Sequence, residues 1–206
     1  FKGLHRVYNN FVYDYLYPNP ASVLAFIENH DTDRFLGEGE NLDMLKQAST
    51  LLLTTRRIPQ LYYGTEVMMN GVKSKSDGYV RKDFPGGWAD DKENALTPEG
   101  RTRLQNESYN FYRNLLNWRK GNDVIAKGSM KQFMVQHGVY AYARQYKGKT
   151  VFVLLNGTDK EVKLPLKYYA EVLKDTTQGK DVISGKVTAL NEELTMAPRQ
   201  SMVIEL

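Results

Sequence analysis

The sequence contains no cysteine among its 206 residues, which excludes disulfide bonds and thiolate metal sites. It has no run of about 20 consecutive apolar residues, so the pattern of a membrane-spanning helix is also missing. Long basic runs are lacking too: the densest clusters are Arg56-Arg57 and Lys73-Ser74-Lys75. The net charge of +4 therefore indicates scattered surface lysines. Nucleic-acid binding rests on the pI alone and is the weakest functional alternative.

Hydrophobic residues make up 41% of the sequence and charged residues 25%, which is typical of a globular protein with one large domain or two small ones. The chain begins at Phe1, without an initiator Met or the layout of a signal peptide. This start predicts a piece of a longer protein or a processed product. The absence of cysteine suits a bacterial protein. The location stays open, with a periplasmic or secreted location slightly favoured over the cytoplasm.

The first part of the chain, residues 1–122, alternates helix-like and strand-like segments, which predicts a parallel α/β fold. Its elements are an amphipathic helix over 4–15, an apolar strand over 22–27 expected to be buried on both faces, a helix over 41–55, and a strand over 58–63. A loop of more than thirty residues follows, and a loop of that length is usually functional. Thr97, Pro98 and Glu99 predict the start of the last helix.

The second part, residues 123–206, changes to a period of two, which predicts a compact antiparallel β-sandwich. The clearest feature is a hairpin in which residues 139–146 and 150–155 flank the turn Lys147-Gly148-Lys149. Further short strands are expected over 161–164, 169–173, 186–190, 194–197 and 201–206. The boundary between the two parts falls near residues 121–127.

A polar cluster, Asn29-His30-Asp31, comes directly after the first apolar strand. Functional residues of parallel α/β folds collect at the carboxyl ends of strands, and carboxylates placed there can serve in the cleavage of glycosidic bonds. The residues alone leave an equal alternative, in which Asp31, Thr32 or Asp33 merely caps a local turn.

Three ordered motifs resemble the α-amylase family of glycoside hydrolases, glycoside hydrolase family 13. Residues 26–31, Phe-Ile-Glu-Asn-His-Asp, are similar to the end of that family's seventh barrel strand, and residues 58–66 to its eighth strand and the following turn. The spacing of Asp77 and Arg81, together with residues 81–88, resembles the neopullulanase and cyclomaltodextrinase branch. The resemblance covers the whole chain. It implies the last two β/α units of a (β/α)8 TIM barrel, followed by the β-sandwich.

The resemblance also implies roles within a retaining mechanism that acts on α-glucans such as starch, pullulan, cyclodextrins or maltooligosaccharides. Asp31 corresponds to the carboxylate that stabilises the oxocarbenium-like transition state. His30, Asp77 and Arg81 would bind the substrate. Asn29 would orient its neighbours, and Trp88 would stack on a sugar ring.

Purely structural explanations remain for several of these residues. Asp77 could belong to a turn ahead of Gly78, Arg81 could pair with Asp83, and core packing is expected for Tyr62 and Tyr63 rather than stacking on sugar.

The family's nucleophile and general acid have no counterpart in this sequence, so we expect the isolated chain to be inactive. No cofactor is expected within it, and calcium binding by a longer enzyme stays open. Exposed strand edges and apolar faces predict self-association. The alternative function is a non-catalytic glucan-binding or interaction protein on an amylase-like scaffold, and the intact Asn29-His30-Asp31 run favours the enzyme.

Overall fold

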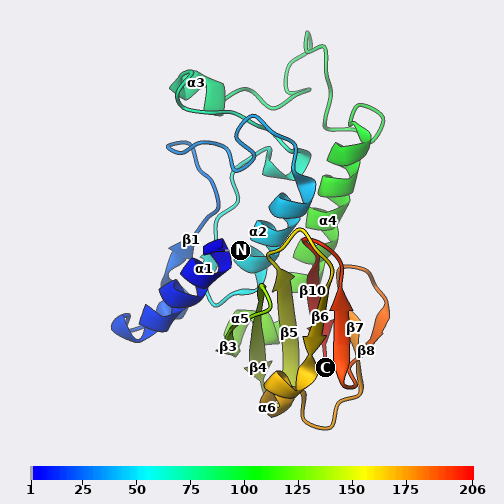
Figure 1. Cartoon of the computed structure of the whole chain (residues 1–206). Coiled ribbons are helices and arrows are strands. Elements are labelled where there is room, and N and C mark those ends of the chain that lie inside the picture. The colour runs from blue at the N-terminus through cyan, green and yellow to red at the C-terminus, as the bar shows by residue number, and fades with distance from the viewer. Residues whose placement is uncertain (1) are drawn as a thin grey trace.

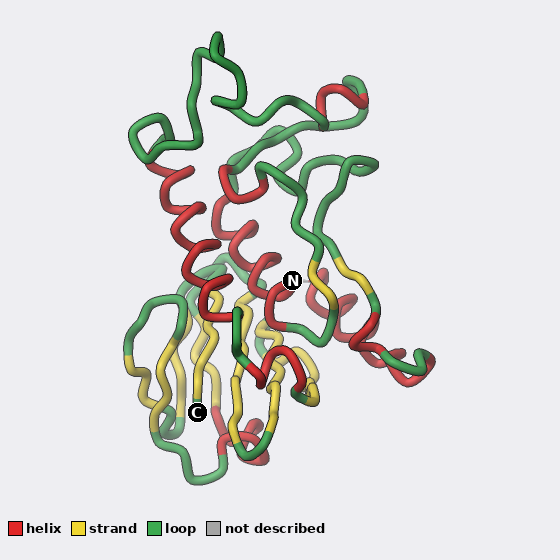
Figure 2. The backbone as a smooth tube through the Cα atoms, turned by 180° about the vertical axis from the view of Figure 1, so that it is seen from behind, coloured by secondary structure: helices red, strands yellow, loops and turns green. Residues whose placement is uncertain are grey.

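The structure is a computed structural model that describes residues 2–206. Figure 1 shows two helices, α2 and α4, standing on a large antiparallel sheet, with long loops and the short helix α3 at the far end of both helices. Figure 2 shows from behind that loops cover most of that far end. The helical segments are α1 (Lys2–Val12), η1 (Tyr13–Leu16), η2 (Pro20–Ser22), α2 (Leu42–Thr54), η3 (Thr65–Val67), α3 (Asp77–Val80), α4 (Arg103–Arg119), α5 (Asp123–Lys127), η4 (Leu166–Tyr169) and α6 (Ala170–Leu173).

The strands form one parallel pair and two antiparallel sheets within the described residues. The pair joins β1 (Leu24–Ala25) to β2 (Ile58–Pro59), and the larger sheet has the order β3-β4-β5-β10-β7-β8. The smaller sheet pairs β6 with β9. The bounds of the antiparallel strands are β3 (Ser129–Gln136), β4 (Val139–Tyr146), β5 (Lys149–Asn156), β6 (Val162–Pro165), β7 (Gln178–Asp181), β8 (Val187–Ala189), β9 (Glu193–Met196) and β10 (Ser201–Glu205).

The predicted parallel pairing is confirmed, but the predicted burial of the first strand is wrong. Leu24 lies opposite Ile58, and the N–H of Gln60 donates to the carbonyl of Ala25 at 2.8 Å. The strand was expected to be buried on both faces, yet the Leu24 side chain is 52% exposed and Phe26 is 43% exposed. A strand is buried only where neighbours flank it and layers cover it, and in the described chain β1 has β2 alone beside it.

The larger sheet carries a core on each face, because residues of its central strands alternate between two packed layers. Ala141 and Phe152 face the layer formed by β6, β9, η4 and α6. Tyr142 and Val153 face α1 and α5 on the other side. The predicted hairpin is confirmed: it turns at Lys147 and Gly148, both with positive φ, which matches the two-residue turn that suits twisted strands.

Two predicted elements are wrong. The segment 169–173 was expected to be a strand but ends η4 and forms α6, where Tyr169 and Leu173 fill the core beneath the larger sheet. Thr97 does not begin the last helix. It starts a separate turn, and α4 begins at Arg103, where Thr102 and Gln105 bond each other's backbone N–H in a capping box. Gly100 closes that turn so tightly that a Cβ there would lie 1.8 Å from the carbonyl oxygen of Asn94.

A buried ion pair ties η1 to the segment between α2 and β2. Asp14 accepts hydrogen bonds from Arg57 and, at 2.8 Å, from Arg56. Burial opposes ionisation of the Asp14 carboxyl, but the hydrogen bonds and charges of Arg57 and Arg56 outweigh it and lower its pKa. The first helix is thereby fixed beside the parallel pair, in the position that Figure 1 shows.

We expect Asp14→Asn to lower the free energy of unfolding at pH 7 by about 1–2 kcal/mol, because two guanidinium groups lose their anion. The folded-state pKa of Asp14 lies below the ordinary 3.8, so its contribution is present above that pH and is lost as the pH falls through the folded-state pKa. Urea unfolding measured from pH 7 downward checks this. Asp159→Asn, at an exposed carboxylate, is the control. A stability difference that stays constant into strong acid would contradict the prediction.

Candidate functional site

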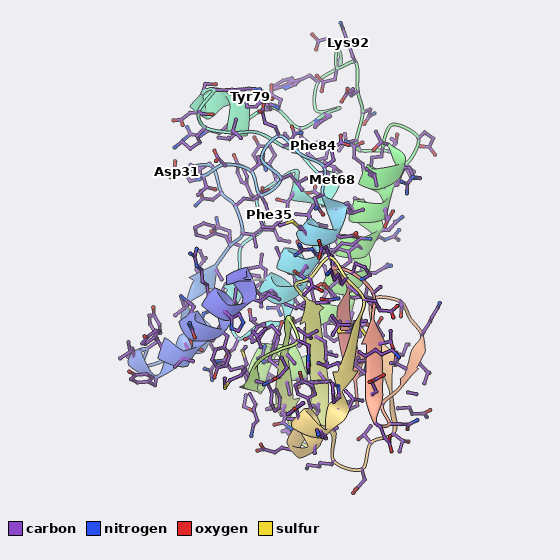
Figure 3. The ribbon with its side chains drawn as sticks, in the orientation of Figure 1. Asp31, Phe35, Met68, Tyr79, Phe84 and Lys92 are labelled. Carbon is purple, nitrogen blue, oxygen red and sulfur yellow. The ribbon has the colours of Figure 1, made fainter. Side chains whose placement is uncertain are left out.

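The loop after β1 presents Asp31 at its tip. The side-chain oxygen of Asn29 accepts a hydrogen bond from the backbone N–H of Asp31 at 2.8 Å, and the N–H of Asn29 donates to Thr32 Oγ1 at 3.1 Å. These bonds make a tight turn that begins at Asn29. Asp31 lies on the side of α3 and away from the antiparallel sheet, and its side chain is 62% exposed (Figure 3).

Asp31 lies between His30 and Arg81. One carboxylate oxygen is 3.2 Å from His30 Nε2, and the other is 3.1 Å from Arg81 Nη2. Arg81 also donates from Nε to the backbone carbonyl of His30 at 3.0 Å. A guanidinium that bonds a carboxylate and the neighbouring carbonyl fixes a direction as well as a distance. The structure therefore brings His30, Asp31 and Arg81 together.

Helix α3 supplies the fourth predicted residue, Asp77. Its cap is Ser76, whose hydroxyl accepts the N–H of Tyr79 at 3.1 Å. Asp77 opens the helix, and its carboxylate lies 3.4 Å from Arg81 Nη2, one helical turn along. The proposed alternative pairing of Arg81 with Asp83 is not formed among residues 2–206. Asp31, Arg81 and Asp77 thus alternate in charge along one surface.

Lys73 completes this surface and was treated in the sequence only as part of a basic cluster. Its Nζ lies 3.3 Å from the Asp77 carboxylate and 3.1 Å from the backbone carbonyl of Asp31. Its backbone N–H donates to Asp33 at 2.6 Å. The residue therefore links the loop after β1 to α3 from a third segment. No sequence signal separated it from ordinary surface lysines.

A buried charged layer lies beneath the exposed residues, and the sequence analysis missed it. Glu28, which directly precedes Asn29, forms an ion pair with Arg34 at 3.2 Å, with both side chains almost fully buried. Glu28 also accepts hydrogen bonds from the Thr65 hydroxyl and from the backbone N–H of Phe35. The signal for this layer was a glutamate at the end of an apolar strand, where a solvated charge is not expected.

The aromatic residues fall into two groups. The Tyr62 ring lies 4.0 Å from the Arg34 guanidinium, and burial is the largest cause of its raised pKa, followed by a hydrogen bond with Tyr63. Tyr63 donates its hydroxyl to the carbonyl of Lys82 at 2.7 Å. Trp88 is 64% exposed on the loop after α3, and no hydrogen bond or ion pair joins it to Asp31 or Arg81 in the described chain. Its proposed sugar contact stays a prediction.

Metal ligands do not gather at this surface. Within residues 2–206, no group of three or more His, Cys, Asp or Glu side chains is placed to hold a metal ion. In the same part of the chain, no helix is both long and apolar enough to cross a membrane. The groups available here are two exposed carboxylates, those of Asp31 and Asp77, with a histidine, an arginine and a lysine beside them.

Comparison with known proteins identifies relatives of the chain. Residues 130–205 match the cyclo-malto-dextrinase C-terminal domain. The chain is 28% identical over 197 residues to an α-amylase of Niallia circulans, covering 92% of this chain and 34% of that protein. It is 30% identical over 196 residues to a cyclomaltodextrin glucanotransferase of Bacillus sp. (strain 6.6.3), covering 88% of this chain and 24% of that protein. The chain is related to the α-amylase family of glycoside hydrolases.

Solved structures of this family share the fold. The α-amylase of Anoxybacillus superposes with a TM-score of 0.76 at 19% identity, covering 96% of this chain and 41% of that one. The α-amylase of Geobacillus thermoleovorans, solved in complex with acarbose, gives 0.75 at 20% identity, covering 96% and 42%. The chain spans about a third or less of the length of the two family members named above. The resemblance that the motifs predicted is thus confirmed, together with an antiparallel β domain of the family type.

Proposed function

We propose that this chain is the C-terminal part of a retaining glycosidase that acts on α-glucans, and that Asp31 is its transition-state-stabilising carboxylate. The observation that carries the proposal is the Asp31–Arg81–Asp77 chain at the carboxyl end of the parallel pair β1–β2. Carboxyl ends of parallel strands form the functional rim of α/β barrels. A fixed carboxylate there would face positive charge as it develops on a glucose ring.

The parallel unit is proposed to be the last two β/α units of a TIM barrel, with residues 1–122 in the barrel and 123–206 in a C-terminal β-sandwich domain. The helix α2 connects β1 to β2, and α4 follows, as in a β/α repeat. The nucleophile and the general acid would then come from earlier barrel strands. This division of labour agrees with the share of its relatives that the chain spans.

The remaining residues are proposed to bind sugar hydroxyls. His30 lies beside Asp31, so it would contact the ring that is cleaved, whereas Asp77 and Arg81 would hold a sugar further away, as in the neopullulanase-like branch. Trp88 would offer an apolar face to a ring, which its exposure permits. The non-catalytic alternative shares every binding contact and differs only in the absence of chemistry elsewhere in the protein.

Asp31→Asn and Arg81→Met should each weaken the binding of maltohexaose to this chain by about tenfold, because a charged hydrogen-bonding group is lost in each case. Titration followed by NMR of the labelled chain gives the dissociation constants. Arg103→Met removes an exposed arginine that is paired with Glu107 on α4, so it is the matched control and should leave binding unchanged. Equal binding by all four proteins would contradict the proposed site.

The isolated chain should not hydrolyse soluble starch, pullulan or cyclodextrins, because one transition-state carboxylate cannot replace a nucleophile and a general acid. A reducing-sugar assay at high protein concentration tests this. Activity that is lost in Asp31→Asn would show that the chain holds a complete catalytic set, and the proposed division of labour would then be wrong.

The chain should also self-associate. Apolar side chains on and beside the parallel pair are exposed, with Leu24 at 52% and Ile58 at 48%, and each strand keeps one unpaired edge among the described residues. Sedimentation velocity over a range of concentrations should show species larger than a monomer. Ile58→Lys should shift the distribution toward the monomer, whereas Val187→Lys, at an exposed valine of β8, should not. A wild-type chain that stays monomeric throughout would refute this.

A further inference from the structure

We infer that Arg34, held by Glu28, is a positioning residue that sets the distance between Asp31 and Arg81. The inference deepens the proposed function and rests on it, because it assigns the buried layer a task at the same site. Arg34 itself is buried and lies out of reach of a bound glucan, so it would act through the residues that it holds.

The guanidinium of Arg34 joins three segments that are distant in the sequence. Its Nη1 donates to Glu28 at 3.2 Å and to the carbonyl of Tyr63 at 2.7 Å. Its Nε donates to the carbonyl of Val80 at 3.0 Å. The three acceptors therefore belong to the loop after β1, to the segment after β2 and to the end of α3.

The positions of these acceptors connect the buried layer to the exposed one. Glu28 is three residues before Asp31, and Val80 directly precedes Arg81. One side chain thus anchors both backbones that carry the Asp31–Arg81 contact. The Glu28 carboxylate also accepts hydrogen bonds from the Thr65 hydroxyl and from the backbone N–H of Phe35, so Glu28 itself is held by two other residues. Figure 3 shows Phe35 deeper in the molecule than Asp31.

The geometry requires arginine rather than lysine. A planar guanidinium can donate in several fixed directions while its face lies on a ring, and Arg34 does so over Tyr62 at 4.0 Å. A lysine at this position would keep the charge next to Glu28, but a single ammonium could not reach the carbonyls of Tyr63 and Val80 in the same directions. The substitution Arg34→Lys therefore keeps the positive charge next to Glu28 but removes the hydrogen bonds to the two carbonyls.

The test measures the Nε proton of Arg81, which donates to the carbonyl of His30 in the wild type. Its exchange with water, followed by NMR on the labelled chain, needs no ligand. Arg34→Lys should accelerate this exchange by about tenfold, because the α3 backbone is no longer held and the Arg81–His30 bond opens more often.

Arg101→Lys is the matched control, since Arg101 is buried, donates to the carbonyls of Thr97 and Leu96, and stacks on Tyr109 at 3.8 Å. It should leave the Arg81 exchange unchanged. Should Arg34→Lys fail to fold, Glu28→Gln decides by the same measurement, because the amide keeps the acceptor for Thr65 but removes the charge that anchors Arg34.

An Arg81 exchange rate within about twofold of wild type in the folded variant, even with a lower melting temperature, would overturn the positioning role and leave a merely structural one.

The maltohexaose titration separates this failure from failure of the proposed function. Faster Arg81 exchange without glucan binding by the wild type supports the positioning role and contradicts the glucan site. In a wild type that binds glucan, Arg34→Lys and Arg81→Met should weaken binding non-additively, because both act through one contact.

Discussion

The placement of the parallel unit on the antiparallel sheet depends on one buried guanidinium, that of Arg144. It donates to four backbone carbonyls: Thr54 at the end of α2, Ile125 in α5, and Gly128 and Ser129 where β3 begins. Burial lowers the pKa of Arg144 to about 10, and within residues 2–206 no carboxylate forms an ion pair with it. Helix carboxyl ends carry partial negative charge, and this is why carbonyls can serve a buried cation. A shared side chain thereby holds α2, α5 and the sheet together.

The contact between Arg144 and the end of α2 also affects the position of the candidate site, which lies beyond the other end of that helix. The last turn of α2 lies at Arg144, and the helix runs from there toward the end of the molecule that carries the long loops and α3 (Figure 1). Thirteen residues of helix span about 20 Å, so an angular error at Thr54 would be magnified at the site. Two further bonds limit that error: the Thr54 hydroxyl meets the Tyr142 hydroxyl at 2.5 Å, and Arg119 donates to the carbonyl of Leu53 at 3.1 Å. The parallel unit is thus joined to the antiparallel sheet by several buried hydrogen bonds.

The sequence predicted those features that depend on local pattern. Alternating residues and the turn at Lys147 and Gly148 predicted the hairpin, and the helical pattern over 41–55 predicted α2, whose cap at Asn41 only the structure shows. The motifs identified Asn29, His30, Asp31, Asp77 and Arg81 as candidate site residues, and the structure shows that His30, Asp31, Arg81 and Asp77 form a chain of contacts. Prediction from local pattern was wrong where tertiary packing determines the secondary structure. Tyr169 and Leu173 have a strand-like composition, but they serve the core from a helical turn.

The buried layer was beyond prediction for a related reason. Glu28 and Arg34 both lie in the loop after β1, where neither helical nor strand periodicity links two side chains, and charged residues are rarely found fully buried. Only the fold shows that Tyr63 and Val80, each from a different segment, turn their carbonyls toward the same guanidinium. Lys73 was missed because its role depends on the path of a loop. Sequence thus identified the side chains that face solvent and not the contacts that hold them.

This division follows from the energetics of charged pairs. The alternating surface chain of Asp31, Arg81, Asp77 and Lys73 is exposed, and such pairs contribute little to stability, about 0–1 kcal/mol each. Weak contacts cannot impose a single geometry on two loops, because water competes for every partner. The geometry of the two loops must therefore be set by the buried layer below them. There the Glu28–Arg34 pair is shielded from water, and opening the pair would leave a buried charge without a partner. The exposed residues are then free to exchange their mutual contacts for those of a polar ligand, while the backbone that carries them stays in place.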